Sequence, residues 1–194
     1  MNLLRYIGIA MVLAVGLLAA CATGTTSVDP MKNYSKALGE TEPRVMGTVT
    51  PGSAREAQAI ARFTDFYRVY SAEVIKSRVR ELYAANAYFR DPFREVIGIE
   101  EIEPYFLSST KAVHLCTFDI SEVAVKNGNY YFRWVMNLTL KRNMEKTLQA
   151  VGMSHVRFGR DGKVTFQQDY WDINVLYEEL PVIRYAVKRV KKSV

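Results

Sequence analysis

The sequence is poor in the residues that build disulfide frameworks and metal centres. Its 194 residues include two cysteines, Cys21 and Cys116, and two histidines, His114 and His155. It contains no Cys-x-x-Cys or His-Glu-x-x-His motif, so it offers no dedicated zinc or haem site. We therefore predict neither a metal nor a cofactor.

A long hydrophobic run is also missing. The apolar stretch from Tyr6 to Leu17 is too short to cross a bilayer comfortably. It follows Arg5 and leads into small residues, which is typical of a cleaved secretory signal over residues 1–20. The ending Leu18-Ala19-Ala20-Cys21 resembles the lipobox of bacterial lipoproteins, and this resemblance implies that Cys21 is lipidated. The alternative is an ordinary signal with an incidental cysteine.

The lipobox resemblance has consequences for location and for the second cysteine. It implies a protein of the bacterial cell envelope, anchored to the membrane through lipid on Cys21. Ala22 follows the cysteine, which resembles sorting to the periplasmic face of the Gram-negative outer membrane. With Cys21 lipidated, Cys116 has no disulfide partner, and its alternating apolar segment predicts a small core residue.

Charge of one sign is not in large excess. The chain has 26 Lys and Arg against 20 Asp and Glu, a net charge of +6. This moderate positive charge does not by itself indicate nucleic-acid binding, and an exported protein is an unlikely partner for nucleic acid. Several of the basic residues lie at the C-terminus, where they indicate either a solvated helix face or contact with anionic lipid head groups.

The composition divides the exported chain into three parts. Residues 21–52 are rich in Thr, Gly, Pro and Ser, which predicts a flexible lipidated tether. Ser53 and Glu56 form a capping box that begins the domain, expected over residues 53–172. Residues 173–194 predict a basic helical tail, interrupted at Pro181.

Within the domain, helical periodicity comes before strand periodicity. Ile60, Phe63 and Tyr67 recur at helical spacing, and further helical patterns follow near residues 75–83 and after Gly98. From residue 115 the pattern alternates between apolar and polar residues. The expected strands span residues 115–126, 130–141, 147–158 and 163–171. Segregated helices and strands predict an α+β fold, with helices covering one face of a curved antiparallel sheet.

The order of these elements resembles the nuclear transport factor 2-like superfamily, which includes ketosteroid isomerases and the SnoaL polyketide cyclase. Residues 152–158, 161–164 and 169–172 look like its SnoaL-like branch. The resemblance covers roughly residues 55–172. It implies a cone-shaped sheet wrapped around the N-terminal helices, with a pocket at the open end and an additional helix at the C-terminus.

The resemblance also implies candidate catalytic residues. The donor tyrosine of the isomerases falls on Tyr67, their carboxylate base on Asp91, and their protonated aspartic acid on Ser154. Because a serine hydroxyl is less acidic than a carboxylic acid, we expect weaker stabilisation of an enolate here. Comparison with the SnoaL cyclase places its acid–base aspartate on Asp169. Two buried carboxyl groups in one cavity would raise each other's pKa.

Other residues are expected to line the pocket. These ligand-binding candidates are Phe89, Trp134, Ser154, Trp171 and His114. Simpler roles remain open for several candidates: Asp91 before a proline is often a turn residue, and Tyr67 lies on the apolar stripe of a helix. His155 adjoins Ser154, so only one of the two faces the cavity in a regular strand, and we expect His155 to be structural.

Three functions are compatible with these features. We favour an envelope lipoprotein whose apolar pocket binds a small hydrophobic molecule. The first alternative is an isomerase, cyclase or hydrolase that uses Asp91 and Asp169 as acid and base. The second is a non-catalytic docking or assembly protein. The open sheet face would also support a homodimer, with apolar contact from Tyr131, Val135 and Val156.

Overall fold

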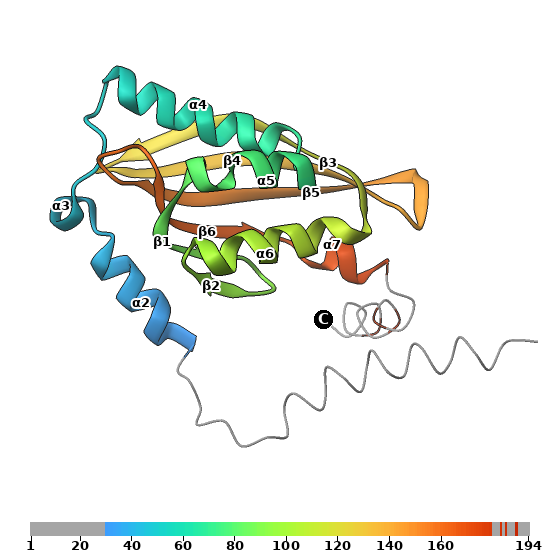
Figure 1. Ribbon diagram of the computed structural model, residues 1–194. Coiled ribbons are helices and arrows are strands. Elements are labelled where there is room, and N and C mark those ends of the chain that lie inside the picture. Colours follow the sequence, from blue (N-terminus) through green and yellow to red (C-terminus); the bar gives the residue numbers. More distant parts are fainter. Residues whose placement is uncertain (1–29, 180–182, 184, 186–188, 190–194) are drawn as a thin grey trace, which may run out of the picture. The chain divides into compact units, whose positions relative to one another are not determined.

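The computed structural model describes residues 30–179 together with residues 183, 185 and 189 (Figure 1). The predicted signal peptide, Cys21 and most of the predicted basic tail lie outside the described residues. The chain divides into two units, residues 1–36 and 37–194, and the description below concerns the second. No helix in the described part of the chain is long and apolar enough to cross a membrane.

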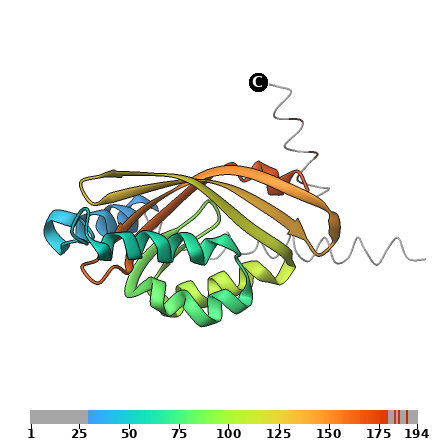
Figure 2. The same ribbon diagram turned by 90° about the horizontal axis from the view of Figure 1, so that it is seen from above.

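Helices lead into a six-stranded sheet. The helices are α2 (Pro30–Glu40), which begins in the first unit, α3 (Pro43–Met46), α4 (Ala54–Arg68), α5 (Ala72–Leu82), α6 (Ile99–Ser109) and α7 (Asn174–Tyr177), with the 3-10 turn η1 (Thr110–Ala112). The strands are β1 (Tyr83–Arg90), β2 (Glu95–Ile97), β3 (Val113–Lys126), β4 (Asn129–Leu140), β5 (Asn143–Phe158) and β6 (Val164–Trp171). Figure 2 shows the sheet arching over α4, α5 and α6.

The strand order is β2-β1-β6-β5-β4-β3. The predicted α+β fold with a curved sheet and a short C-terminal helix is therefore confirmed. One detail differs, because β1 and β6 are parallel and the sheet is mixed rather than wholly antiparallel. Three consecutive hairpins from β3 to β6 fix the direction of β6, which then runs alongside β1. The Asn127-Gly128 turn joins β3 to β4, with both residues at positive φ (52° and 76°).

The predicted capping box begins α4. The Ser53 hydroxyl accepts a hydrogen bond from the Glu56 amide at 3.2 Å. The Glu56 carboxylate accepts one in return from the Gly52 amide at 2.6 Å, one residue earlier than in the usual box. The core then forms between α4–α6 and the concave face of the sheet. Within this core the rings of Phe63 and Phe132 stack with their centroids 4.2 Å apart.

Cys116 is a buried, free thiol, as the sequence predicted for a small core residue. Burial raises the pKa of this thiol to about 12. A thiol that stays protonated at neutral pH is a poor nucleophile. Cys116 therefore contributes packing rather than reactivity.

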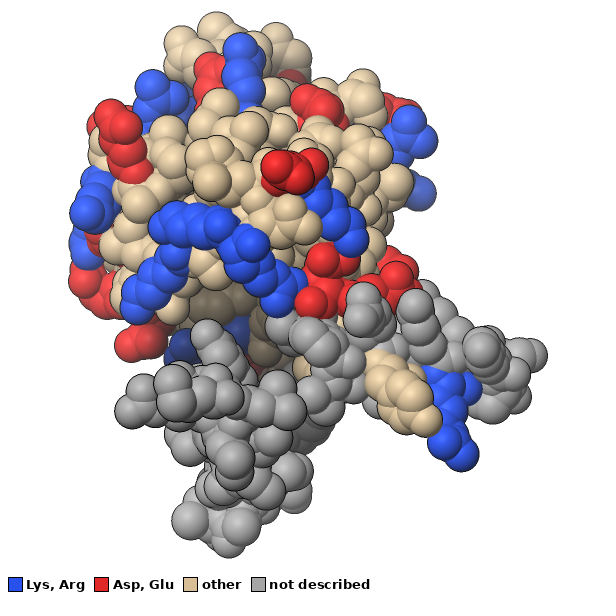
Figure 3. Space-filling model, turned by 90° about the vertical axis from the view of Figure 1, so that its right-hand side faces the viewer, with Lys and Arg blue, Asp and Glu red and all other residues tan. Residues whose placement is uncertain are grey.

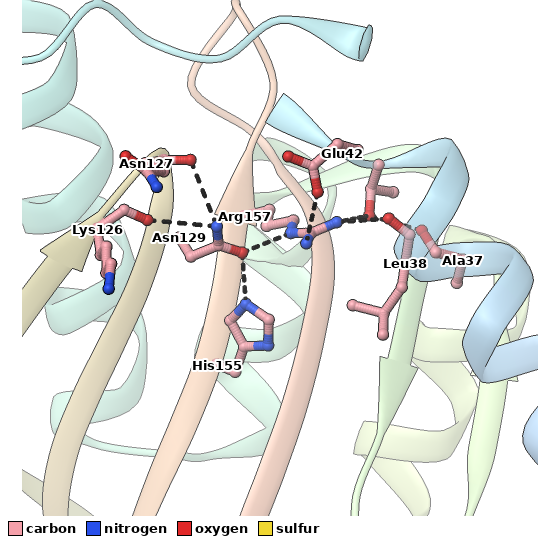
Figure 4. Close-up of polar contacts among 9 residues, drawn as sticks. Ala37, Leu38, Glu42, Lys126, Asn127, Asn129, His155 and Arg157 are labelled. Carbon is pink, nitrogen blue, oxygen red and sulfur yellow. Dashed lines mark hydrogen bonds and ion pairs between the residues drawn. The ribbon is translucent and has the colours of Figure 1, made fainter. Parts of the chain in front are cut away.

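The predicted unstructured tether has helical structure in its described part, residues 30–52. It contains α2 and α3, and Val49 is 1% exposed in the core. The buried guanidinium of Arg157 on β5 explains why residues 38–42 are ordered. It donates to the Leu38 carbonyl (2.6 Å), donates to the Thr41 hydroxyl (3.1 Å) and pairs with the Glu42 carboxylate (3.2 Å; Figure 4). Composition alone could not reveal this distant partner.

One residue that was predicted to lie on the outer face of the sheet, Val156, lies on the inner face instead. Val156 is fully buried, because it pairs with Tyr130 and both side chains point into the core. It therefore cannot supply contact on the outer face. The residues opposite Tyr131 and Val135 are His155 and Val151 instead, and Val151 is 69% exposed.

Candidate functional site

A cavity of about 410 Å³ lies between the concave face of the sheet and helices α4 and α6. This volume falls in the range of about 300–1,000 Å³ typical of small-molecule sites. Nine of its twenty lining residues are aromatic, three of them tyrosines, and two serines and two aspartates also line it. The aromatic residues include Tyr67, Tyr70, Phe89, Tyr105, Phe118 and Trp134. Both predicted carboxyl groups, Asp91 and Asp169, reach this one cavity.

Asp169 is held by one of its two carboxyl oxygens. It lies on β6 directly opposite Ser154 on β5. Its Oδ1 accepts hydrogen bonds from the Ser154 hydroxyl (2.6 Å) and from Nε2 of Gln167 (2.9 Å). The indole of Trp134 donates in turn to the Ser154 hydroxyl at 3.0 Å. No hydrogen bond from a described residue reaches Oδ2, which leaves that oxygen available to a molecule in the cavity.

The environment of Asp169 brings its titration close to neutral pH. Burial raises the pKa of this carboxyl to about 7, although the bonds from Ser154 and Gln167 oppose the rise. The nearby charge of Asp91 raises the pKa further. Both the neutral and the ionised form of Asp169 are therefore populated near pH 7. A group in this state can donate or accept a proton.

Asp91 serves the turn after β1 and the cavity at the same time. Its Oδ1 accepts from the amides of Phe93 and Arg94, both at 2.8 Å. Its Oδ2 accepts from the Tyr105 hydroxyl on α6 at 2.6 Å. Burial raises the pKa of Asp91, while the bond from Tyr105 and the backbone bonds lower it. The two roles that the sequence left open for Asp91 are both present.

Tyr67 faces the cavity with its ring, while its hydroxyl belongs to a buried network. That hydroxyl lies 2.7 Å from the Tyr83 hydroxyl and accepts from Nε2 of Gln167 at 3.0 Å. Tyr83 donates to Oε1 of Gln167 at 2.5 Å, so its single proton is already used and Tyr67 donates to Tyr83. Burial raises the pKa of both phenols. Tyr67 is thus linked to Asp169 through Gln167.

The remaining predicted site residues fall into three places. Phe89, Trp134 and Trp171 line the cavity. Ser154 lies behind Asp169 and fixes that carboxylate. His114 is exposed on β3 and is not among the lining residues.

His155 has a structural environment on the opposite face of the sheet from Ser154. Its Nε2 lies 2.8 Å from Oδ1 of Asn129, and its ring stacks on Tyr131 with centroids 4.8 Å apart. Burial, and to a smaller extent Arg157, lower the pKa of His155 to about 4. The imidazole is therefore neutral at physiological pH and away from the cavity.

Three residues that position the site were missed from the sequence. Gln167 was detectable, because it lies two residues before Asp169 on the same strand and so shares its face. Tyr83 and Tyr105 gave no such signal, since their hydroxyl partners lie on other elements. Among the described residues, no group of three Cys, His, Asp or Glu side chains is arranged to hold a metal ion.

Basic side chains gather outside the cavity, at the end of the sheet where β4 turns into β5. The Lys141 ammonium donates to the Lys111 carbonyl at 2.9 Å. Arg142 donates to the Glu179 carbonyl, and Lys146 pairs with the Glu179 carboxylate at 2.5 Å. Figure 3 shows this end of the molecule, with Lys and Arg side chains in an arc across it. None of the described residues that line the cavity is Lys, Arg or His.

Comparison with known families agrees with this architecture. The model of the SnoaL-like domain family matches residues 63–167, just over half of the chain. The chain belongs to the SnoaL-like family. The SnoaL-like match includes Tyr67, Asp91 and Ser154 and ends two residues before Asp169. No curated protein matches the chain.

Solved structures share the SnoaL-like fold at low identity. A Burkholderia pseudomallei protein of unknown function, described as NTF2-like, is 10% identical with a TM-score of 0.56, covering 65% of this chain and 97% of its own. A Catenulispora acidiphila protein with a ketosteroid isomerase-like fold, in complex with trimethylamine, is 14% identical (TM-score 0.52; 66% and 92% covered). An LEH-like epoxide hydrolase of M. tuberculosis is 14% identical (TM-score 0.53; 71% and 97% covered). At these identities the likeness concerns the fold alone.

Proposed function

We propose that this SnoaL-like domain binds a small, mainly apolar molecule in the cavity under its sheet. The observation that carries the proposal is the cavity itself, about 410 Å³ of space with aromatic walls and two carboxyl groups. Burying an apolar guest against such walls is favourable, and a few polar groups at fixed positions give it an orientation.

Intrinsic fluorescence tests this proposal, because both tryptophans of the chain line the cavity. Titration with a neutral apolar probe, N-phenyl-1-naphthylamine, is expected to quench the tryptophans and saturate. Leu138→Trp should weaken the binding because it fills the cavity, whereas Val151→Trp on the exposed outer face should not. A probe that fails to saturate, or binds both variants equally, would reject the cavity as the binding site.

Acid–base catalysis is a second candidate, favoured by the state of Asp169. One oxygen is held by two donors, the other receives no hydrogen bond from a described residue, and the pKa is about 7. These properties suit a group that exchanges a proton with a bound substrate. Turnover of a panel of ketones and epoxides should be lost in Asp169→Asn, while the variant stays folded with a melting temperature no lower than that of the wild type. Unchanged turnover would exclude Asp169 as the acid or base.

We also propose that the protein is a lipoprotein of the cell envelope, anchored through Cys21. The support is the sequence pattern of residues 5–21. Expression in a Gram-negative host with labelled fatty acid is expected to label the wild type but not Cys21→Ser. Cys116→Ser provides the matched control and should remain labelled. Equal labelling of both variants, or none of the wild type, would contradict the anchor.

A further inference from the structure

Among the described residues that line the cavity, two are acidic and none is Lys, Arg or His. Asp91 and Asp169 both line it, and each raises the electrostatic cost of ionising the other. The Arg94 guanidinium lies 5.7 Å from the ring centroid of Tyr105, whose hydroxyl donates to Asp91. Arg94 is not a lining residue, and Lys111, Lys141 and their neighbours lie at the outer rim.

The walls around the two carboxyl groups are aromatic. Tyr67 and Tyr70 stack at 5.9 Å, and Phe118 packs edge-on against both rings and against Trp134. Aromatic faces carry partial negative charge and attract cations, most strongly where water is excluded. The acidic groups and the aromatic walls therefore both favour a positively charged ligand.

We propose that the cavity selects an organic cation: an apolar molecule carrying a quaternary ammonium or protonated amine, held near Asp91 and Asp169 against the aromatic walls. This inference rests on the proposed binding function and specifies the chemistry of the ligand. The Oδ2 atom of Asp169, which no described residue hydrogen-bonds, is the anionic contact. The apolar remainder occupies the side of the cavity formed by Met136, Leu138 and Leu140.

The binding of such a cation should depend on pH through Asp169. A quaternary ammonium does not titrate, so any change reports a protein group. Its affinity is expected to rise as the pH increases through about 7, because the carboxyl becomes ionised. The Arg94 guanidinium lies over the Tyr105 ring, whose hydroxyl donates to Asp91. The other titratable groups around the cavity are Asp91, Tyr67, Tyr70, Tyr105 and Cys116.

A charged probe and its uncharged isostere test the inference on the full chain. Benzyltrimethylammonium and neopentylbenzene differ only in a nitrogen cation replaced by carbon. Tryptophan fluorescence at pH 8 should give a dissociation constant about tenfold lower for the cation, or more. Asp169→Asn should remove most of that preference while leaving neopentylbenzene binding within about threefold. Asp119→Asn, an exposed carboxylate on β3, is the matched control and should retain the preference.

The outcomes separate this inference from the function on which it rests. If neopentylbenzene binds as tightly as the cation, the cavity is an apolar site without charge selection, and only the inference is overturned. If neither probe binds, the proposed binding function is overturned with it. A preference for the cation that survives in Asp169→Asn would also reject the inference as stated, because the assigned anionic contact would not be responsible.

Discussion

Replacing Asp169 by Asn should make the protein more stable at pH 8 than the wild type. In the folded state the pKa of Asp169 is about 7, against an ordinary value of 3.8. Between these two values the folded carboxyl keeps a proton that the unfolded chain has lost, so stability falls as the pH rises. Three pKa units correspond to about 4 kcal/mol, an upper figure since water in the cavity reduces it.

The substitution isolates this electrostatic contribution because asparagine keeps the contacts. Its Oδ1 can still accept from Ser154 and Gln167, as the carboxylate oxygen does now at 2.6 and 2.9 Å. The neutral amide carries no charge that must be buried. We therefore expect the variant and the wild type to have similar stability at pH 4, with the variant gaining steadily up to pH 8.

Urea denaturation at several pH values measures this difference. The comparison between variant and wild type matters because His155 acts in the opposite direction. Its lowered pKa of about 4 makes stability rise between about pH 4 and 6.5, and this contribution cancels in the difference. Asp119→Asn serves as the exposed control. A difference between Asp169→Asn and wild type that stays constant from pH 4 to 8 would refute the reasoning.

Three further predictions follow from the same contacts. Asp91→Asn should lower the pKa of Asp169, seen by carboxyl NMR titration, since a neighbouring charge is removed; an unchanged value would show that the two groups do not interact. Gly152→Ala should cost about 1–3 kcal/mol in urea denaturation, because its Cβ would overlap the Trp134 ring; a neutral effect would place that ring elsewhere. Arg157→Met should cost about 1–3 kcal/mol by leaving the Leu38 carbonyl, the Thr41 hydroxyl and the Glu42 carboxylate without their donor, and stability equal to wild type would disprove the contacts.

The order of elements was predictable because it rests on local patterns. The Ser53 cap, the stripe through Phe63 and Tyr67, and the alternation of Trp134 along its strand each use neighbours a few residues away. The expectation that Asp169 faces the pocket came instead from the family resemblance. The meeting of Asp91 and Asp169 in one cavity then followed from the family resemblance rather than from spacing.

The features that were missed depend on contacts between distant residues. Arg157 orders residues 38–42 from more than a hundred positions away, so a segment that reads as a tether becomes part of the domain. The inward direction of Val156 was missed for a related reason. Strand alternation fixes which residues share a face, but the pairing partner Tyr130 decides which face is inside. Neither fact is present in composition or periodicity.

The direction of the hydrogen bonds determines where a proton on Asp169 must lie. Trp134 donates to Ser154, and Ser154 and Gln167 both donate to Oδ1 of Asp169. An oxygen that already accepts two hydrogen bonds is a poor position for a proton, so the neutral carboxyl carries it on Oδ2. The same oxygen receives no hydrogen bond from a described residue and belongs to a side chain that lines the cavity. Titration of Asp169 therefore changes that oxygen from a donor into an acceptor, and both proposed uses of the cavity depend on this one atom.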